Sequence, residues 1–129
     1  MKCPSCGKGE TFRPWSGKLA VMGVEVAATG KRCSSCDETL FTADEVEQQE
    51  RAAAELIVAR GVRTGEEFRF VRKVAGLRAN DVAAMLDATP ETVSRWEGGK
   101  LAIPRLAAFA LGELFEHPKI ARRKLEAFA

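Results

Sequence analysis

The four cysteines of the chain form two pairs with the same spacing, Cys3-Pro-Ser-Cys6 and Cys33-Ser-Ser-Cys36. Two residues between the cysteines of a pair let both sulfurs point to one side of a tight turn, so each pair supplies half of a tetrahedral metal site. The first 36 residues must therefore bring two separate turns together at one point. This pattern predicts one structural zinc ion held by Cys3, Cys6, Cys33 and Cys36.

The same thiols are compatible with three other chemistries. A redox C-x2-C pair precedes a helix in an α/β setting, whereas here there are two pairs and the first begins at the third residue. Disulfides are not expected, because the N-terminus has no apolar signal segment and we expect a cytoplasmic protein, where thiols stay reduced. Iron is a further candidate for the four sulfurs. Four thiolates close the coordination shell, and no acid–base pair is evident, so we expect no enzyme.

The segment between the cysteine pairs predicts a small sheet. Leu19 and Val21, then Val24, Val26 and Ala28, indicate short β-strands interrupted at Gly23 and closed by Thr29-Gly30. So small a segment cannot bury much core, and the metal should stabilise it. Two residues directly follow the cysteine pairs where such turns favour positive φ, namely Gly7 and Asp37.

A helix follows the second cysteine pair. Thr42-Ala-Asp-Glu45 is a capping box, and the helix should run to Arg60 and end at Gly61. Its acidic side is either a solvated helix face or a surface for a basic partner. We place a zinc-binding domain with a small sheet and this linking helix at residues 1–61. Residues 62–129 form the second domain, and Gly61–Thr64 is the expected hinge.

The second domain reads as five helices. Thr64 to Glu67 is another capping box, opening a helix to Ala75 with Gly76 as its stop. Two short helices follow, and prolines then start the last two, at Pro104 and Pro118. The Pro104 helix carries a wider apolar stripe than one core face needs. We expect the surplus to form a homodimer interface; the alternative is a domain that buries it all internally.

The stretch Leu77–Pro104, LRANDVAAMLDATPETVSRWEGGKLAIP, predicts two short helices joined by a tight turn. Thr89 followed by Pro90 is a strong helix start, because the hydroxyl caps the first N–H groups and proline lacks the N–H that would be unpaired. Val93 and Trp96 then face inward. The side chains left outward are those that a reader of the DNA major groove presents, Glu91, Thr92, Ser94 and Arg95. The alternative is a helical hairpin without a nucleic-acid partner.

The segment TPETVSRWEGGK resembles the recognition helix and following turn of Xre/Cro-type repressors, in which S-x-x-x-[IV]-S-x-W-E-x-G-x is typical. Ala83 matches the small residue between the two helices of this motif. Asp87 falls on the turn position that usually holds glycine, and aspartate tolerates the left-handed conformation better than most residues. The usual Thr-Gln at the start of the first helix is here Arg78-Ala79, so we expect Arg78 to supply the phosphate contact.

Net charge, +2, gives no support for nucleic-acid binding, which depends on the motif and on local basic clusters. Arg95 is expected at a base edge, most plausibly a guanine. Phosphate contacts are expected from Thr89, Thr92, Ser94 and Lys100. Three clusters are either phosphate-facing or solvated helix surface: Arg69, Arg72, Lys73 and Arg78; Arg95, Lys100 and Arg105; and Arg122, Arg123 and Lys124.

The whole chain resembles the MqsA/YgiT-type family of zinc-finger and helix-turn-helix antitoxins. The resemblance is carried by the opening Met-Lys-Cys-Pro-x-Cys, the second pair near position 35, the core Val93-Ser94-Arg95-Trp96-Glu97, and His117-Pro118 before the last helix. It implies a mostly α chain with a small zinc-bound β/knuckle N-terminal domain and a five-helix Xre/Cro-like helix-turn-helix C-terminal domain. It also implies a zinc domain that binds and inactivates a small ribonuclease toxin, and a C-terminal domain that dimerises and represses the shared operon. In this family the recognition helix reads bases through an asparagine and an arginine; Arg95 matches the arginine, and Glu91 stands at the asparagine position, where it is expected to meet a cytosine amino group.

A stand-alone zinc-stabilised helix-turn-helix regulator without a toxin is the alternative. Both interpretations share double-stranded operator DNA as a partner, and neither involves a membrane, because no apolar run approaches the roughly 20 residues of a span. A small basic open reading frame beside the gene, or co-purification of a toxin, would distinguish them.

Overall fold

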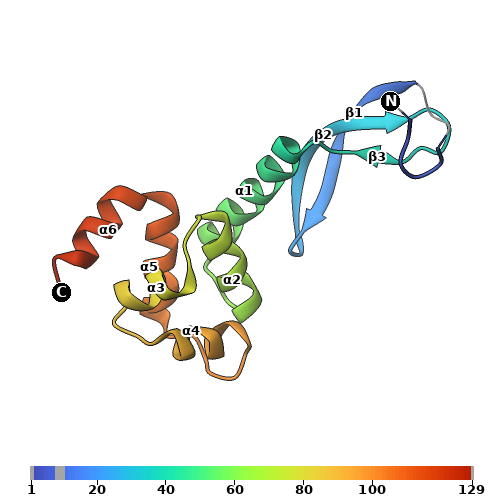
Figure 1. Cartoon of the computed structure of the whole chain (residues 1–129). Coiled ribbons are helices and arrows are strands. Elements are labelled where there is room, and N and C mark those ends of the chain that lie inside the picture. The colour runs from blue at the N-terminus through green and yellow to red at the C-terminus, as the bar shows by residue number, and fades with distance from the viewer. Residues whose placement is uncertain (1, 8–10, 129) are drawn as a thin grey trace. The chain divides into compact units, whose positions relative to one another are not determined.

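The computed structural model describes residues 2–7 and 11–128, and the chain divides into two compact units, Met1–Ala53 and Ala54–Ala129. The described residues hold one three-stranded antiparallel sheet and six helices, so the chain is mostly helical (Figure 1). The division falls within the first helix, whereas residues 61–62 were the expected boundary. None of the helices in these residues has the length and apolar character needed to cross a membrane.

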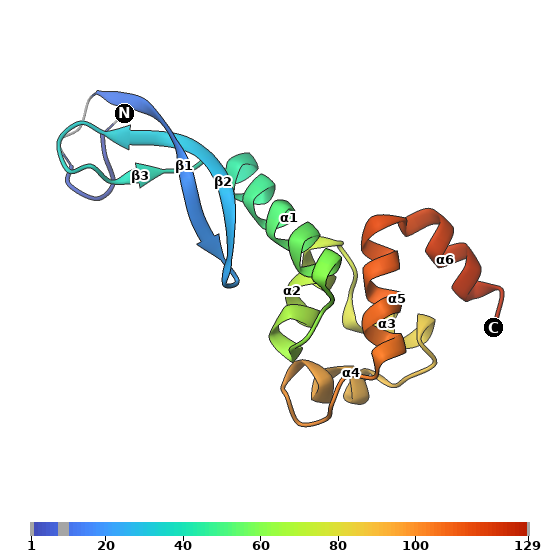
Figure 2. The same cartoon turned by 180° about the vertical axis from the view of Figure 1, so that it is seen from behind.

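The first unit is built on a long β-hairpin. Strands β1 (Phe12–Val21) and β2 (Val24–Cys33) pair over their whole length, and β3 (Thr39–Leu40) pairs with the end of β2 (Figure 2). Met22 and Gly23 connect the strands with φ values of 51° and 77°. Two successive positive φ values match the type I′ turn, whose twist suits a two-residue hairpin.

The expectation that the second strand closes at Thr29-Gly30 is wrong, because β2 continues through both residues to Cys33. Gly30 has a packing role instead. A Cβ on it would lie 2.7 Å from the Leu40 carbonyl oxygen and 2.7 Å from the Phe41 ring. Glycine is needed here because neighbouring groups approach the backbone closely, as often happens at glycines inside strands.

Helix α1 (Ala43–Arg60) begins at the predicted capping box. The Thr42 N–H donates to Glu45 Oε1 at 2.8 Å, and the Glu45 N–H donates to Thr42 Oγ1 at 3.2 Å. These two bonds satisfy amide groups that the first helical turn leaves unpaired. Phe41, just before the helix, packs edge-on against Trp15 of β1 with ring centroids 6.0 Å apart.

The second unit contains the end of α1 and five further helices. They are α2 (Gly65–Val74), α3 (Ala79–Met85), α4 (Pro90–Glu97), α5 (Arg105–Glu116) and α6 (Pro118–Glu126). The predicted starts at Thr64, Thr89 and Pro118 are confirmed: both threonines accept a hydrogen bond from the amide three residues on, and Pro118 is the first residue of α6.

Helices α2, α3 and α4 end in the same backbone motif. At the end of α2, the Leu77 N–H reaches back to the Arg72 carbonyl and the Gly76 N–H to the Lys73 carbonyl. Equivalent pairs of bonds close α3 and α4. This Schellman arrangement needs a left-handed residue, and the three helices supply it with Gly76, Asp87 and Gly99, at φ values of 73°, 53° and 75°.

The core of the second unit lies where α2, α4 and α5 meet. Phe68 of α2 and Trp96 of α4 form an edge-to-face pair, with centroids 5.9 Å apart. Val71, Val93 and Leu111 are fully buried. The backbones of α2 and α4 approach so closely at Gly65 that an added Cβ would collide with the carbonyl oxygens of Trp96 and Glu97. The end of α4 is therefore fixed against the start of α2.

The short connection from α1 to α2, expected as a hinge, is bridged by side chains. The guanidinium of Arg60 binds the Glu67 carboxylate with two nitrogens, and one of them also donates to the Gly61 carbonyl. The Arg63 N–H donates to Glu67 Oε1 at 2.9 Å. The second capping box is thus only half formed, because the Glu67 carboxylate turns toward Arg60 and Arg63.

Candidate functional site

The four cysteine sulfurs meet at one end of the hairpin. Cys33 is the last residue of β2, and the other three lie in the turns before β1 and after β2. All four Sγ atoms lie within 4.8 Å of one another. The Sγ atoms of Cys3 and Cys36 are 3.7 Å apart, and those of Cys6 and Cys33 are 3.8 Å apart. The four residues predicted as ligands are therefore brought together.

These distances fit a single metal ion. A disulfide would require about 2.05 Å between sulfurs. A tetrahedral ion about 2.3 Å from each sulfur instead sets the sulfurs about 3.8 Å apart. Four thiolates would complete such a shell, with no position for water or substrate. The cluster can thus hold one metal ion in a closed, structural type of site.

Backbone hydrogen bonds give both cysteine turns the same shape. The Gly7 N–H donates to the Cys3 carbonyl at 2.8 Å, and the Asp37 N–H donates to the Cys33 carbonyl at 3.0 Å. Gly7 and Asp37 have φ values of 71° and 59°, which confirms the positive φ expected after each pair. The Ser35 N–H also points at Cys33 Sγ from 3.4 Å, as a donor to a thiolate would.

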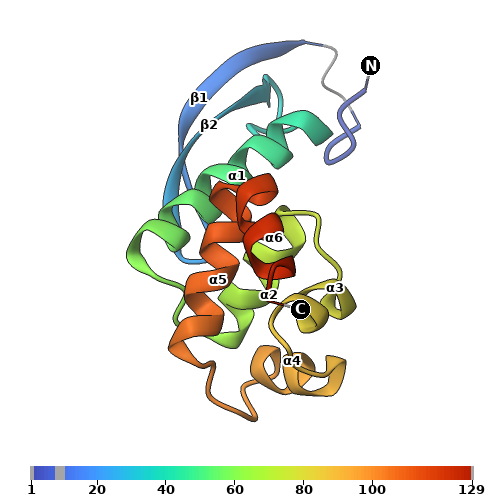
Figure 3. The same ribbon diagram turned by 90° about the vertical axis from the view of Figure 1, so that its left-hand side faces the viewer.

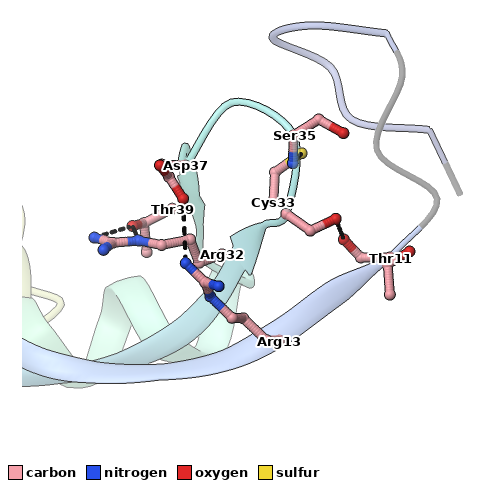
Figure 4. Close-up of polar contacts among 8 residues, drawn as sticks. Thr11, Arg13, Arg32, Cys33, Ser35, Asp37 and Thr39 are labelled. Carbon is pink, nitrogen blue, oxygen red and sulfur yellow. Dashed lines mark hydrogen bonds and ion pairs between the residues drawn. The ribbon is translucent and has the colours of Figure 1, made fainter.

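Polar contacts with neighbouring residues hold the second cysteine turn in place (Figure 4). The Ser34 hydroxyl donates to the Thr11 carbonyl at 2.9 Å. Arg13 pairs with Asp37 at 3.2 Å, and Arg32 donates to the Thr39 hydroxyl on the far side of the turn. The Arg13–Asp37 pair is well exposed and adds little stability by itself, but it helps to orient the turn.

The cysteines do not ionise alike. Backbone N–H groups of Cys36 and Ser35 lower the pKa of Cys33 by stabilising its thiolate. At Cys36, an exposed residue, the backbone of Glu38 acts to lower the pKa, but partial loss of solvent around the thiol and the neighbouring cysteines together raise it to about 12. Like charges in one site disfavour each other's ionised form. A cation bound among the sulfurs would remove that repulsion.

A second candidate surface is the outer side of α4, which follows α3 through a short turn (Figure 3). Val82 and Ala83 of α3 and Val93 and Trp96 of α4 are buried. Glu91, Ser94 and Arg95 are exposed, as expected, and so is Lys100 after the helix. Three of the four side chains predicted to face outward on α4 therefore do so.

The two threonines at the start of α4 are engaged with each other. Thr89 Oγ1 accepts from the Thr92 N–H at 3.1 Å and lies 2.9 Å from Thr92 Oγ1. Thr92 is half-buried, and it faces a groove shared with Leu106 and Leu125. The Thr92 hydroxyl contacts the N-cap residue Thr89. Thr92 is therefore not one of the exposed side chains on the outer side of α4.

Arg78, expected to contact phosphate, is exposed but paired. Its Nε donates to Asp81 Oδ2 at 3.1 Å, and the Arg78 N–H also reaches Asp81 Oδ2, at 3.4 Å. The Arg78 side chain lowers the pKa of the Asp81 carboxyl, and Arg122 on α6 adds to this effect. A phosphate at Arg78 would have to compete with Asp81.

Arg72 is not a surface cation but a buried one, which the sequence analysis missed. Its Nε and Nη2 donate to the two carboxylate oxygens of Glu97 at 2.7 and 3.0 Å, and its Nη1 donates to the Leu77 carbonyl at 3.0 Å. Burial of Arg72 could have been predicted from its position in the apolar stripe of α2, one turn after Phe68 and next to Val71. A charged residue at a core position requires a buried partner.

The predicted surplus of apolar surface is found on the last two helices. Leu106 and Phe109, one turn apart on α5, are 79% and 65% exposed, while Leu111 and Leu114 on the same helix are buried. Ile120 on α6 is 48% exposed. A single chain therefore does not bury this stripe internally.

A scan against protein-family models finds no match, and a search of curated proteins finds none of significance. Membership of the antitoxin family thus stays a prediction based on the motifs.

Proposed function

We propose that the chain is a DNA-binding transcription repressor whose α3 and α4 form a helix-turn-helix, with α4 as the recognition helix. The observation that carries this proposal is the division of side chains on α4. Val93 and Trp96 are buried against the other helices, while Glu91, Ser94 and Arg95 stand exposed on the other side. A recognition helix must present such a polar face to base edges while its apolar face fixes it to the scaffold.

Arg95 is the proposed base-reading residue. It is exposed in the last turn of α4, and no hydrogen bond or ion pair engages its side chain within the described residues. Arginine donates two parallel hydrogen bonds to the O6 and N7 of guanine, the commonest specific contact in the major groove. Glu91, one turn earlier on the same face, accepts hydrogen bonds and suits a cytosine amino group.

The cysteine cluster is proposed to hold one structural zinc ion. Zinc accepts four thiolates in tetrahedral geometry, and the sulfur separations fit that geometry. Bound zinc would join the N-terminal turn to the end of β2, which hydrogen bonds alone secure weakly in so small a unit. The closed shell favours this structural role over an enzymatic one.

An antitoxin role extends the proposal and rests on the resemblance described above. The zinc unit would then inactivate a small ribonuclease toxin, and the helical unit would repress the operon as a dimer. Exposed Leu106 and Phe109 on α5 support the dimer, because a contiguous apolar face on one chain is commonly covered by another. Co-purification of the product of a neighbouring gene with the full-length chain tests the toxin partner.

Fluorescence anisotropy tests the DNA proposal directly. The wild-type chain and Arg95→Ala are titrated onto duplex DNA from upstream of the protein's own gene and onto a scrambled duplex. We expect Arg95→Ala to lose about 1–3 kcal/mol on the upstream duplex and little on the scrambled one. The stoichiometry of the complex, expected to be two chains per site, reports the dimer in the same titration.

Arg95→Lys is the matched control. It keeps the positive charge but lacks the planar fork that makes two parallel bonds. We expect it to bind scrambled DNA like wild type and to lose specificity like Arg95→Ala. Equal affinity of all three proteins for the upstream duplex would contradict the placement of α4 in the major groove.

A further inference from the structure

A small hollow lies between α2, α3 and α4, beside the exposed face of α4. It is lined by Arg69, Arg72, Ala79, Ser94, Glu97 and Gly98. Two of these residues, Ala79 and Gly98, have little or no side chain, and this leaves the hollow open. The other four are polar, and two of them are arginines. The hollow therefore combines space with hydrogen-bond donors.

Arg72 forms the fixed part of the hollow. Its side chain is 10% exposed, and three of its five N–H groups are used by Glu97 and Leu77. The remaining N–H groups, on Nη1 and Nη2, are outside these bonds. Because these bonds already hold the guanidinium, a ligand that accepts the remaining donors need not immobilise a flexible side chain.

Arg69 and Ser94 form the adjustable part. Arg69 is exposed on α2 one turn before Arg72, and no ion pair or hydrogen bond of its side chain is found in the described part of the chain. Ser94 is exposed on α4 and also lines the hollow, and its hydroxyl can donate a hydrogen bond. Glu97 neutralises Arg72, so Arg69 leaves the hollow with one net positive charge. That balance suits a monoanion.

We propose that this hollow binds one phosphodiester group of the DNA backbone, with Arg69 closing over the phosphate and Arg72 and Ser94 donating to its oxygens. The inference rests on the proposed DNA-binding function and adds a site to it. A phosphodiester carries a single charge and several acceptor oxygens, and arginine forks match phosphate geometry. Glu97 cancels the charge of Arg72, so the one uncompensated positive charge, on Arg69, matches an anion of charge −1.

The hollow lies next to the residue proposed to read the bases, so a phosphate bound there would help to orient the protein on DNA. Ser94 precedes Arg95, the proposed base reader, by one residue on α4. Phosphate contacts fix the register of a protein on the duplex, whereas base contacts specify the sequence. A phosphate held beside Ser94 would set the depth and orientation at which Arg95 enters the groove. The contact itself should be indifferent to sequence.

The test is the salt dependence of DNA binding by the full-length chain. Arg69→Gln removes the charge, Arg69→Lys keeps it, and Lys73→Gln removes a charge from the next exposed turn of α2, away from the hollow. Each protein is titrated onto upstream and scrambled duplexes at several salt concentrations. Circular dichroism confirms that each variant is folded.

Loss of one phosphate contact lowers the slope of log affinity against log salt by about 0.9. We therefore expect the affinity ratio between 50 and 200 mM salt to shrink by about 3.5-fold for Arg69→Gln, equally on both duplexes. Arg69→Lys and Lys73→Gln should keep the wild-type slope. An unchanged slope for Arg69→Gln, or the same decrease for Lys73→Gln, would overturn the site. Failure of the wild-type chain to bind either duplex would instead contradict the proposed function, and the site with it.

Discussion

Asp87 shows how a single residue limits the stability of the α3–α4 turn. It supplies the left-handed position of a Schellman motif, with φ of 53°, where the ends of α2 and α4 use glycine. A left-handed conformation costs an L-residue roughly 1–2 kcal/mol, somewhat less for aspartate. Its negative charge also lies at a helix C-terminus, where the helix dipole disfavours anions. The left-handed conformation expected for Asp87 in this turn is confirmed by its φ value.

Asp87→Gly should therefore stabilise the helical unit. Glycine removes the cost of the left-handed conformation but gains backbone entropy in the unfolded chain, which offsets part of that benefit. We expect a net rise of about 0.5–1 kcal/mol in the free energy of unfolding. Asp87→Asn removes only the charge and should give a smaller gain. Urea unfolding followed by circular dichroism measures both variants. A lower urea midpoint for Asp87→Gly than for wild type would contradict this account of the turn.

Between elements, the Arg72–Glu97 pair fixes α4 relative to α2. Both side chains are 10% exposed, so removal of one partner leaves a buried charge without compensation. We expect Arg72→Met or Glu97→Leu to lower the free energy of unfolding by about 3–5 kcal/mol. The double variant should lose much less than the sum, because it leaves no unpaired charge. Denaturant unfolding of the four proteins completes the cycle, and additive losses would show that the two side chains do not act as a pair.

The junction of α1 and α2 gives a prediction about pH. Hydrogen bonding to Arg60 lowers the pKa of Glu67 below its ordinary value of 4.5, with help from the Arg63 N–H. A carboxyl whose pKa is lowered by folding stabilises the folded state above its unfolded pKa, and this contribution is lost as pH falls through the folded value. Wild type should thus exceed Glu67→Gln in stability at pH 7, and the difference should diminish below about pH 4.5. Unfolding at a series of pH values measures it; a difference that stays constant down to pH 2 would refute the assignment.

Local signals explain which elements the sequence predicted. Helix starts at Thr42, Thr89 and Pro118 were predictable because a cap or an initial proline acts within one turn of chain. The cysteine cluster was predictable because the spacing itself encodes the geometry of the turns. Gly30 misled the strand prediction, since glycine in isolation indicates a break. Its close approach to Phe41 could not be predicted locally, because Phe41 follows β3 and reaches Gly30 only when the sheet has formed.

Contacts between distant residues were not predictable in this way. Arg72 and Glu97 are 25 positions apart, and the packing of α2 against α4 decides that they meet. The same holds for the hollow beside Ser94, whose walls come from three helices. The exposed face of α4 was predicted well because helical periodicity assigns inward and outward positions once two inward residues are known.

The whole molecule divides stability between two different sources. Residues 54–129 enclose a hydrophobic core around Phe68, Trp96 and Leu111. The described residues of the first unit, 2–7 and 11–53, bury few large side chains, and a bound metal would supply the missing stabilisation. Each unit holds one tryptophan, Trp15 in the hairpin and Trp96 in α4. Removal of the metal should therefore affect the two tryptophans differently.

The decisive measurement treats the protein with a strong zinc chelator and follows metal release, tryptophan emission and DNA binding together. Trp15→Phe isolates the emission of Trp96, and its difference from wild type reports Trp15. We expect one zinc ion released per chain, a red shift of Trp15 emission, and unchanged Trp96 emission with retained binding to the upstream duplex. Loss of the Trp96 signal and of DNA binding at the same chelator concentration would contradict a helical DNA-binding unit that folds independently of the metal.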